Sequence, residues 1–285
     1  MIPASLDYVA PTSIADALSA LANGGEEAKV IAGGQSLMPV LRLRLAYPTT
    51  LVDLRNVPDL RGVREDNGDL VIGAMTRHCD VITNGLIAQH APLIAAATKT
   101  VADPAIRHRG TFGGALSHAD PAGDLPAVTL ALDATFVVEG PGGRRTVPAS
   151  EFFVDYLQSA LAPDELLVEV RVPKLTGWGV HYEKFQRVAQ AWAIVGVAAA
   201  VRMENGAIAE ARVGLTNMGP TPVRAAAVEA ALAGIAAEPG AVGAATAATA
   251  EGTRPPSDLG GAADYRQHLA QVLARRAVLA AAGSV

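Results

Sequence analysis

The sequence predicts an α+β fold with two domains, and three observations support this prediction. Helical and extended segments alternate over the first 55 residues, an order that favours parallel strand pairing. Further on, Asp-Asn-Gly at 66–68 and Glu-Asn-Gly at 204–206 each separate two apolar runs, which indicates antiparallel hairpins. The last third of the chain is rich in alanine, which indicates packed helices.

The first predicted helix begins after Ser13, a favoured N-cap residue, with Asp16 three positions further on in the place of the usual capping-box glutamate. Asn23-Gly24 is a helix stop. Two strands are predicted at 29–34 and 49–54, separated by a short helical or irregular segment. We expect these strands to pair in parallel, because a crossover connection joins them.

The middle of the chain alternates hairpins with helices. Hairpins are predicted at 61–76 and 134–148, and a helical stretch at 78–101 is interrupted near Pro92. Residues 102–126 are punctuated by glycine and proline, which predicts a long loop. A strand at 165–173 ends at its proline.

A composition shift predicts a domain boundary near residue 175, which gives domains of residues 1–175 and 176–285. The second domain is expected to contain a small antiparallel sheet and a group of helices. Its predicted elements are a strand at 181–188, a hairpin at 193–217, and helices at 221–236, 238–251 and 262–282.

Composition excludes several classes of protein. The net charge of −5 and the lack of a basic run give little support to nucleic-acid binding. Cys79 is the one cysteine, so the chain can form neither an internal disulfide nor a thiolate iron–sulfur site. The sequence contains no apolar run near the roughly 20 residues of a membrane span and no signal-peptide pattern. We therefore expect a soluble, cytoplasmic protein.

Two glycine pairs are the main candidates for a binding site. Gly33-Gly34 follows an apolar run and precedes Gln35 and Ser36, and the second pair, Gly113-Gly114, has Thr111 beside it. Successive backbone amides in tight glycine turns form anion-binding concavities. The residues alone leave two readings open, a pyrophosphate cradle and plain structural turns, and neither pair matches the G-x-G-x-x-G pattern. In the first reading, a side chain added at these glycines would collide with ligand and not with the core.

Other polar residues allow both structural and functional interpretations. Asp124 is either a helix-start acid or an acceptor for ligand hydroxyl groups. Arg107 and Arg109 are expected on a solvated face, with phosphate binding as the alternative. The six histidines show no zinc-ligand spacing. Trp192 is either a core residue or a surface on which a flat ligand stacks.

The segments "AGGQSLMP", "RGTFGG" and "DPAGDLP" together resemble the FAD-binding medium subunits of the molybdenum hydroxylases, which include xanthine dehydrogenases and aerobic carbon monoxide dehydrogenases. The resemblance extends along the whole chain through "LVDLRNVPDLRGV", "VIGAMT", "YEKFQR" and "VGLTN", and is strongest to the carbon monoxide dehydrogenase medium subunit. It implies a PCMH-type FAD-binding domain with two subdomains, residues 1–55 and 56–175, followed by a C-terminal flavoprotein domain of antiparallel sheet and helix bundle.

The resemblance also implies a set of cofactor-binding residues. Ala32 to Ser36 match the family's first pyrophosphate loop, and Thr111 to Gly114 match the second, with Ala115 where many members have asparagine. Some flavoproteins of the broader fold attach FAD through a histidine beside the first loop, where this chain has Gln35, so we expect non-covalent FAD. The full set is Ala32, Gly33, Gly34, Gln35, Ser36, Val101, Thr111, Gly113, Gly114, Asp124, Leu167, Lys184 and Trp192.

The expected function is electron transfer through FAD. The family places molybdopterin in a large subunit and [2Fe–2S] clusters in a small subunit. We expect both subunits as partners in a dimer of heterotrimers, with an external quinone or carrier protein as the electron acceptor. No acid or base for substrate chemistry is expected here, and peripheral membrane association stays open. The alternatives are a medium subunit of a xanthine, aldehyde or N-heterocycle hydroxylase, a stand-alone flavin reductase, and a scaffold without cofactor.

Overall fold

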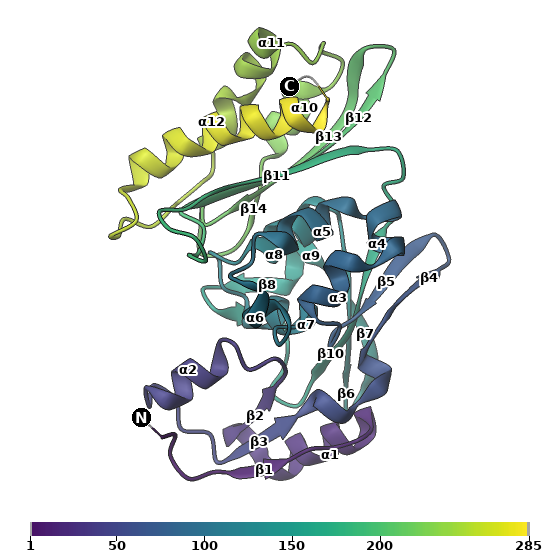
Figure 1. The fold of residues 1–285 in the computed structure, drawn as a ribbon, viewed down its shortest axis with the longest axis vertical. Coiled ribbons are helices and arrows are strands. Elements are labelled where there is room, and N and C mark those ends of the chain that lie inside the picture. Colours follow the sequence, from purple (N-terminus) through teal and green to yellow (C-terminus); the bar gives the residue numbers. More distant parts are fainter. Residues whose placement is uncertain (1, 284–285) are drawn as a thin grey trace.

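The computed structural model describes residues 2–283. Figure 1 shows an elongated molecule in which a small sheet near the N-terminus, a five-stranded sheet and a four-stranded sheet follow one another along the long axis. We call residues 1–175 the N-terminal domain and residues 176–285 the C-terminal domain, a division that we propose from the sequence. None of the helices within residues 2–283 combines the length and the apolar character that crossing a membrane requires.

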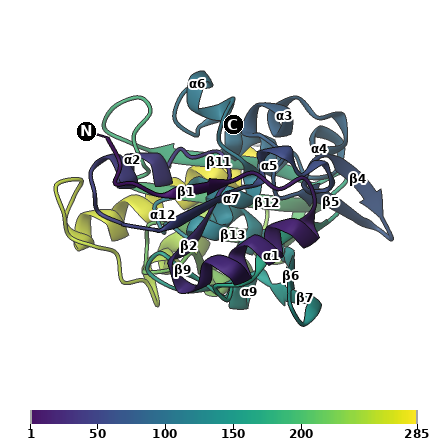
Figure 2. The same ribbon diagram turned by 90° about the horizontal axis from the view of Figure 1, so that it is seen from below.

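The first sheet is parallel throughout, with the strand order β1-β3-β2, and Figure 2 shows α1 beside it. The predicted parallel pairing is confirmed, as is the N-cap, because the Ser13 hydroxyl accepts from the amide of Asp16. The sequence prediction missed β1, which has only three residues, too few for a recognisable alternation of apolar and polar side chains. The elements are β1 Asp7–Val9, α1 Ile14–Gly24, β2 Ala28–Ile31, α2 Leu37–Arg42 and β3 Thr50–Asp53.

The second sheet is antiparallel, with the order β4-β5-β10-β6-β7. The hairpin turn is confirmed, because Asn67 and Gly68 both have positive φ, 48° and 93°. Its strands are β4 Val63–Asp66, β5 Asp69–Gly73, β6 Thr135–Gly140, β7 Gly143–Pro148 and β10 Leu166–Pro173; β8 Phe153–Asp155 and β9 Gln158–Ser159 form a separate pair.

Helices cover this sheet where the sequence predicted one interrupted helix and a long loop. The break at Pro92 is confirmed, and a second break occurs where Asn84 caps the next helix. The prediction of a loop over 102–126 is wrong, because short helices form there and bury Phe112 and Leu116 in the core. The helices are α3 His78–Thr83, α4 Gly85–His90, α5 Pro92–Lys99, α6 Pro104–Arg107, α7 Phe112–His118, α8 Asp124–Ala131 and α9 Ala149–Phe152.

The C-terminal domain has an antiparallel sheet in the order β11-β12-β13-β14. Alternation along β12 divides its side chains: Ala198 and Ala200 join the core of the N-terminal domain, while Val197 and Val201 pack with α12. The elements are β11 Gly179–Phe185, β12 Val195–Glu204, β13 Ala207–Thr216, β14 Val223–Arg224, α10 Ala226–Leu232, α11 Pro239–Ala245 and α12 Ala263–Ala281. Short 3₁₀ turns occupy Gly25–Glu27, Leu54–Asn56, Pro58–Leu60 and Thr246–Ala250.

Candidate functional site

The first glycine pair lies in a partly exposed turn between β2 and α2. Gly34 has a φ of +74°, a conformation that favours glycine. Within residues 2–283 we find no hydrogen-bond acceptor for the backbone amides of residues 33–36. The Ser36 side chain precedes α2 without capping it. Four successive free amides, with a hydroxyl beside them, form the kind of concavity that binds an anion.

The second glycine pair differs from this expectation, because it lies in the first turn of α7. The Gly113 amide donates to the carbonyl of Ala74 at 2.8 Å, and the Gly114 amide donates to the Thr111 hydroxyl at 3.2 Å. Both amides are therefore already paired within the protein. A role for these two residues in cofactor binding stays a prediction, and it cannot rest on free amides.

Glycine at position 33 allows the first glycine segment to lie against the residues that precede the second one. A Cβ on Gly33 would overlap the carbonyl oxygen of Arg109 and lie 2.7 Å from the Gly110 Cα. A Cβ on Gly114 would lie 2.6 Å from the Thr111 hydroxyl oxygen. One on Gly113 would lie 2.5 Å from the Ala74 Cβ. The expectation that added side chains would meet ligand is therefore wrong for these three positions, because they would meet protein first.

A cavity of about 120 Å³ opens where the two segments meet. Its lining includes Ala32, Gly33 and Thr111 together with a group of basic residues. These basic residues are Arg55, Arg61, Arg77, His108 and Arg109. Guanidinium groups bind phosphate through paired hydrogen bonds. The cavity is smaller than the 300–1,000 Å³ typical of sites that enclose a whole ligand, so it suits one charged group of a larger molecule.

The charges around the cavity are only partly compensated. Arg55 pairs with Asp53 at 2.6 Å, and Arg77 pairs with Asp80 at 2.9 Å. The four arginine side chains that line the cavity therefore have only two carboxylates, those of Asp53 and Asp80, as ion-pair partners. Sequence reasoning considered Arg109 as a phosphate ligand but missed the other three arginines. The signal that could have identified these three arginines is their position next to predicted strands. Arg55 follows the end of β3, and Arg61 and Arg77 flank the β4–β5 hairpin.

His78 lies beneath the second segment. Its amide donates to the Gly110 carbonyl at 3.0 Å, and a Cβ on Gly110 would lie 2.7 Å from the imidazole Cδ2. The side chain is buried, and its Nδ1 has no hydrogen-bond partner in the described part of the chain. Burial, and secondarily the nearby Arg107, lower the pKa of His78 to about 4. The imidazole is therefore neutral at physiological pH.

Asp124 and Lys184 are 60 residues apart in sequence and form a buried ion pair. The Lys184 Nζ lies 2.8 Å from Asp124 Oδ2, and the two side chains are 5% and 3% exposed. The Tyr182 hydroxyl donates to the other carboxylate oxygen at 2.7 Å, and Lys184 also donates to the Thr100 carbonyl at 3.1 Å. Burial raises the pKa of the Asp124 carboxyl, and Lys184 opposes that rise. Burial and the neighbouring carboxylate also raise the pKa of Tyr182 well above its ordinary range.

The other predicted site residues lie in different surroundings. Val101 is half-buried and follows Thr100, whose carbonyl accepts a hydrogen bond from Lys184. The carbonyl of Val101 accepts a hydrogen bond from Arg107 at 2.7 Å. Leu167 lies in the core of the N-terminal domain. Trp192 is 56% exposed in the loop that joins β11 to β12, so it is a surface residue and not a core one. Contact of these three residues with a ligand stays a prediction.

Comparisons with known proteins agree along the whole chain. Residues 4–175 match the family described as "FAD binding domain in molybdopterin dehydrogenase", and residues 180–281 match "CO dehydrogenase flavoprotein C-terminal domain". The carbon monoxide dehydrogenase medium chain of Hydrogenophaga pseudoflava is 42% identical over 284 residues, which cover 99% of this chain and 98% of that one.

One further relative and one solved structure also cover nearly the whole chain. The 6-hydroxypseudooxynicotine dehydrogenase complex subunit alpha of Paenarthrobacter nicotinovorans is 39% identical over 278 residues, 97% of this chain and 94% of that one. A solved structure of carbon monoxide dehydrogenase from Hydrogenophaga pseudoflava has a TM-score of 0.96 at 44% identity and covers 100% of this chain and 99% of that one.

The geometry fits the cofactor that the family model names. FAD carries an anionic diphosphate, for which the free amides of residues 33–36 and the basic cavity beside them are suitable partners. The fold, the relatives and this fit agree. The chain therefore belongs to the FAD-binding medium subunits of the molybdenum hydroxylases.

Proposed function

We propose that this chain is the electron-transfer subunit of a molybdenum hydroxylase, with carbon monoxide dehydrogenase as the first candidate assembly. It takes electrons from [2Fe–2S] clusters in a small partner subunit and passes them to an external quinone or carrier protein. The observation that carries the proposal is the run of four free amides at 33–36 beside a cavity with four arginines. Cys79, as the one cysteine, cannot supply the four thiolates of a cluster, so the clusters belong to a partner.

The residues of this chain bind and orient the cofactor. The amides of residues 33–36 and the cavity arginines would hold the diphosphate, and Lys184 would supply a positive charge at the flavin half of the cofactor. Asp124 and Tyr182 fix the position of that charge, because both hydrogen-bond within the same buried cluster. When bound, FAD supplies the ability to accept electrons singly and to pass on one or two, which links one-electron clusters to different acceptors.

FAD is bound without a covalent link, since Gln35 occupies the place of a linking histidine. Acid denaturation of the purified protein should release all flavin to the supernatant, and chromatography should identify it as FAD. Flavin that stays with the precipitate, or FMN in its place, would contradict this. A colourless chain that takes up no added FAD would favour the scaffold alternative.

Partners are tested by expression with the neighbouring genes. We expect the chain to purify with a large molybdopterin subunit and a small iron–sulfur subunit, at a native mass that fits a dimer of heterotrimers. Substrate should then reduce the flavin only in the complex. If the isolated chain reduces or oxidises a substrate at full rate, it is a stand-alone flavin enzyme and the proposal is wrong.

A second candidate assembly is an N-heterocycle hydroxylase. It is favoured by the 39% identity to the 6-hydroxypseudooxynicotine dehydrogenase subunit, close to the 42% for the carbon monoxide dehydrogenase chain. The substrate site lies in another subunit, so residues of this chain do not decide between them. Reduction of the assembled complex by carbon monoxide or by a pyridine derivative does.

A further inference from the structure

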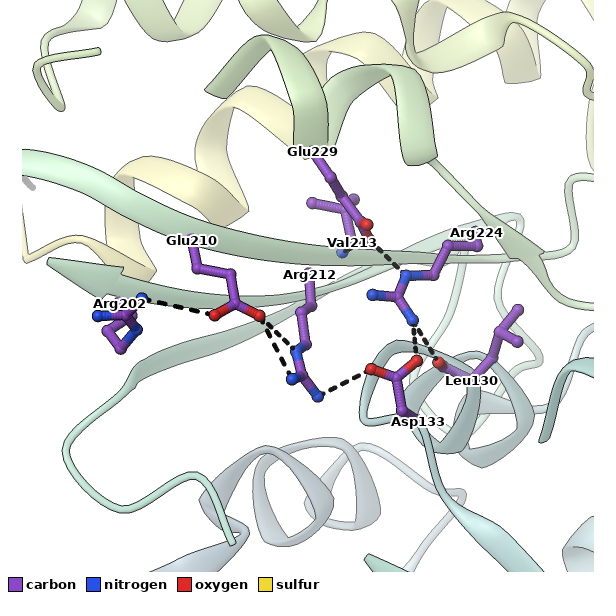
Figure 3. A network of polar contacts seen from close by, with 8 residues as sticks. All are labelled: Leu130, Asp133, Arg202, Glu210, Arg212, Val213, Arg224 and Glu229. Carbon is purple, nitrogen blue, oxygen red and sulfur yellow. Dashed lines mark hydrogen bonds and ion pairs between the residues drawn. The ribbon is translucent and has the colours of Figure 1, made fainter. Parts of the chain in front are cut away.

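Helix α8 is held at both of its ends by the C-terminal domain. At its N-terminus, Asp124 meets Tyr182 and Lys184 of β11. Two residues beyond its C-terminus, Asp133 meets Arg212 of β13 and Arg224 of β14, as Figure 3 shows. One helix of the N-terminal domain therefore carries both the buried pair of the cofactor site and a second cluster of charges.

The cluster at Asp133 is a connected network. Arg212 Nη1 lies 3.0 Å from one carboxylate oxygen of Asp133, and Arg224 donates to the other and to the Leu130 carbonyl at 3.2 Å (Figure 3). Glu229 in turn accepts from Arg224 at 2.6 Å, and Glu210 accepts from Arg212 at 3.3 Å. The arginine side chains are 16% and 26% exposed and the Asp133 side chain is 51% exposed, so water screens these contacts in part.

The middle of α8 lies directly on the sheet. A Cβ on Gly214 of β13 would overlap the Ala127 carbonyl oxygen, so only glycine permits this close approach. Toward the Asp133 end the two domains separate, and a cavity of about 320 Å³ lies between them, lined by residues that include Leu130, Ala149 and Glu229. Leu130, Ala131 and Leu132 at that end are nonetheless buried in the core, so the polar contacts of Asp133 add to apolar packing there.

We propose that Asp133 is a positioning residue for the cofactor site. By fixing the C-terminal end of α8 on β13 and β14, it sets the tilt of the helix about its contact with Gly214. That tilt places Asp124 opposite Lys184 at the other end. The inference rests on the proposed function, in which Lys184 serves the flavin half of FAD and residues 33–36 serve the diphosphate.

Asp133→Asn is the sharpest test. Asp133 has a φ of +51°, which asparagine tolerates, so the variant removes the charge without straining the backbone. We expect the dissociation constant of FAD, measured by fluorescence titration of the full chain, to rise about five-fold, the effect of losing roughly 1 kcal/mol. ADP, which lacks the flavin and needs only the diphosphate contacts, should bind as it does to the wild type.

Two control variants complete the experiment. Asp133→Glu should recover part of the FAD affinity, and Asp155→Asn, which removes an exposed acid from the same domain, should bind both ligands like the wild type. Unchanged FAD affinity in Asp133→Asn would overturn the inference. An equal loss for FAD and ADP would also overturn it, because it would indicate general loosening. A wild-type chain that binds ADP but not FAD would refute the proposed function as well.

Discussion

Replacing Lys184 by methionine tests whether its pair with Asp124 is truly desolvated. The two side chains are 5% and 3% exposed, so the variant would leave a buried carboxylate with Tyr182 as its remaining side-chain donor. Removing one partner of a buried pair costs about 3–5 kcal/mol, because the other charge stays uncompensated. We therefore expect the free energy of unfolding at pH 8, from urea titration of the chain without FAD, to fall by that amount.

The direction in which the stability of Lys184→Met changes with pH is a second test of the prediction. Burial already raises the pKa of Asp124 in the folded protein, and Lys184 lowers it, so the variant should raise it further. The folded state then binds a proton at pH values where the unfolded chain, with a pKa near 3.9, does not. The stability of Lys184→Met should consequently increase as pH falls from 8 to 5, narrowing its difference from the wild type.

A double variant supplies the control. Asp124→Asn combined with Lys184→Met removes both charges, so it should be less destabilised than the sum of the two single variants by about 2 kcal/mol or more. Strict additivity would refute the reasoning. So would a loss below about 1 kcal/mol in Lys184→Met at pH 8, because that is the size of an exposed pair.

Two further predictions concern Gly33 and His78. Gly33→Ala should lower stability by about 1–3 kcal/mol and weaken FAD binding, because the added Cβ overlaps the Arg109 carbonyl, whereas Gly142→Ala meets open space and should be neutral in the same urea and fluorescence titrations. The pKa of His78, lowered to about 4, lies below the unfolded value near 6.5, so stability should fall as pH drops through that interval, by up to about 3 kcal/mol. In His78→Gln, the urea midpoint of unfolding should no longer fall over this pH interval. If the midpoint falls as much as in the wild type, other groups cause the pH dependence.

Much of the fold follows from local sequence signals. Ser13 and Asn67-Gly68 determined a helix start and a hairpin turn because capping and positive φ depend on a few adjacent residues. The second glycine pair shows the limit of such signals. Glycine disfavours helices, so the segment predicted a loop, yet burial of Phe112 and the cap at Thr111 stabilise a helix there.

The sequence by itself determined most of the strands and helices outside residues 102–126, the tight glycine turn after β2 and, through family resemblance, the residues Asp124 and Lys184. Only the tertiary structure decided that these two residues pair, that β10 lies between β5 and β6, and that four arginines from separate segments line one cavity. The reason is physical. Local motifs depend on neighbours in the chain, whereas pairs and cavities depend on how apolar faces pack, and that packing brings distant residues together.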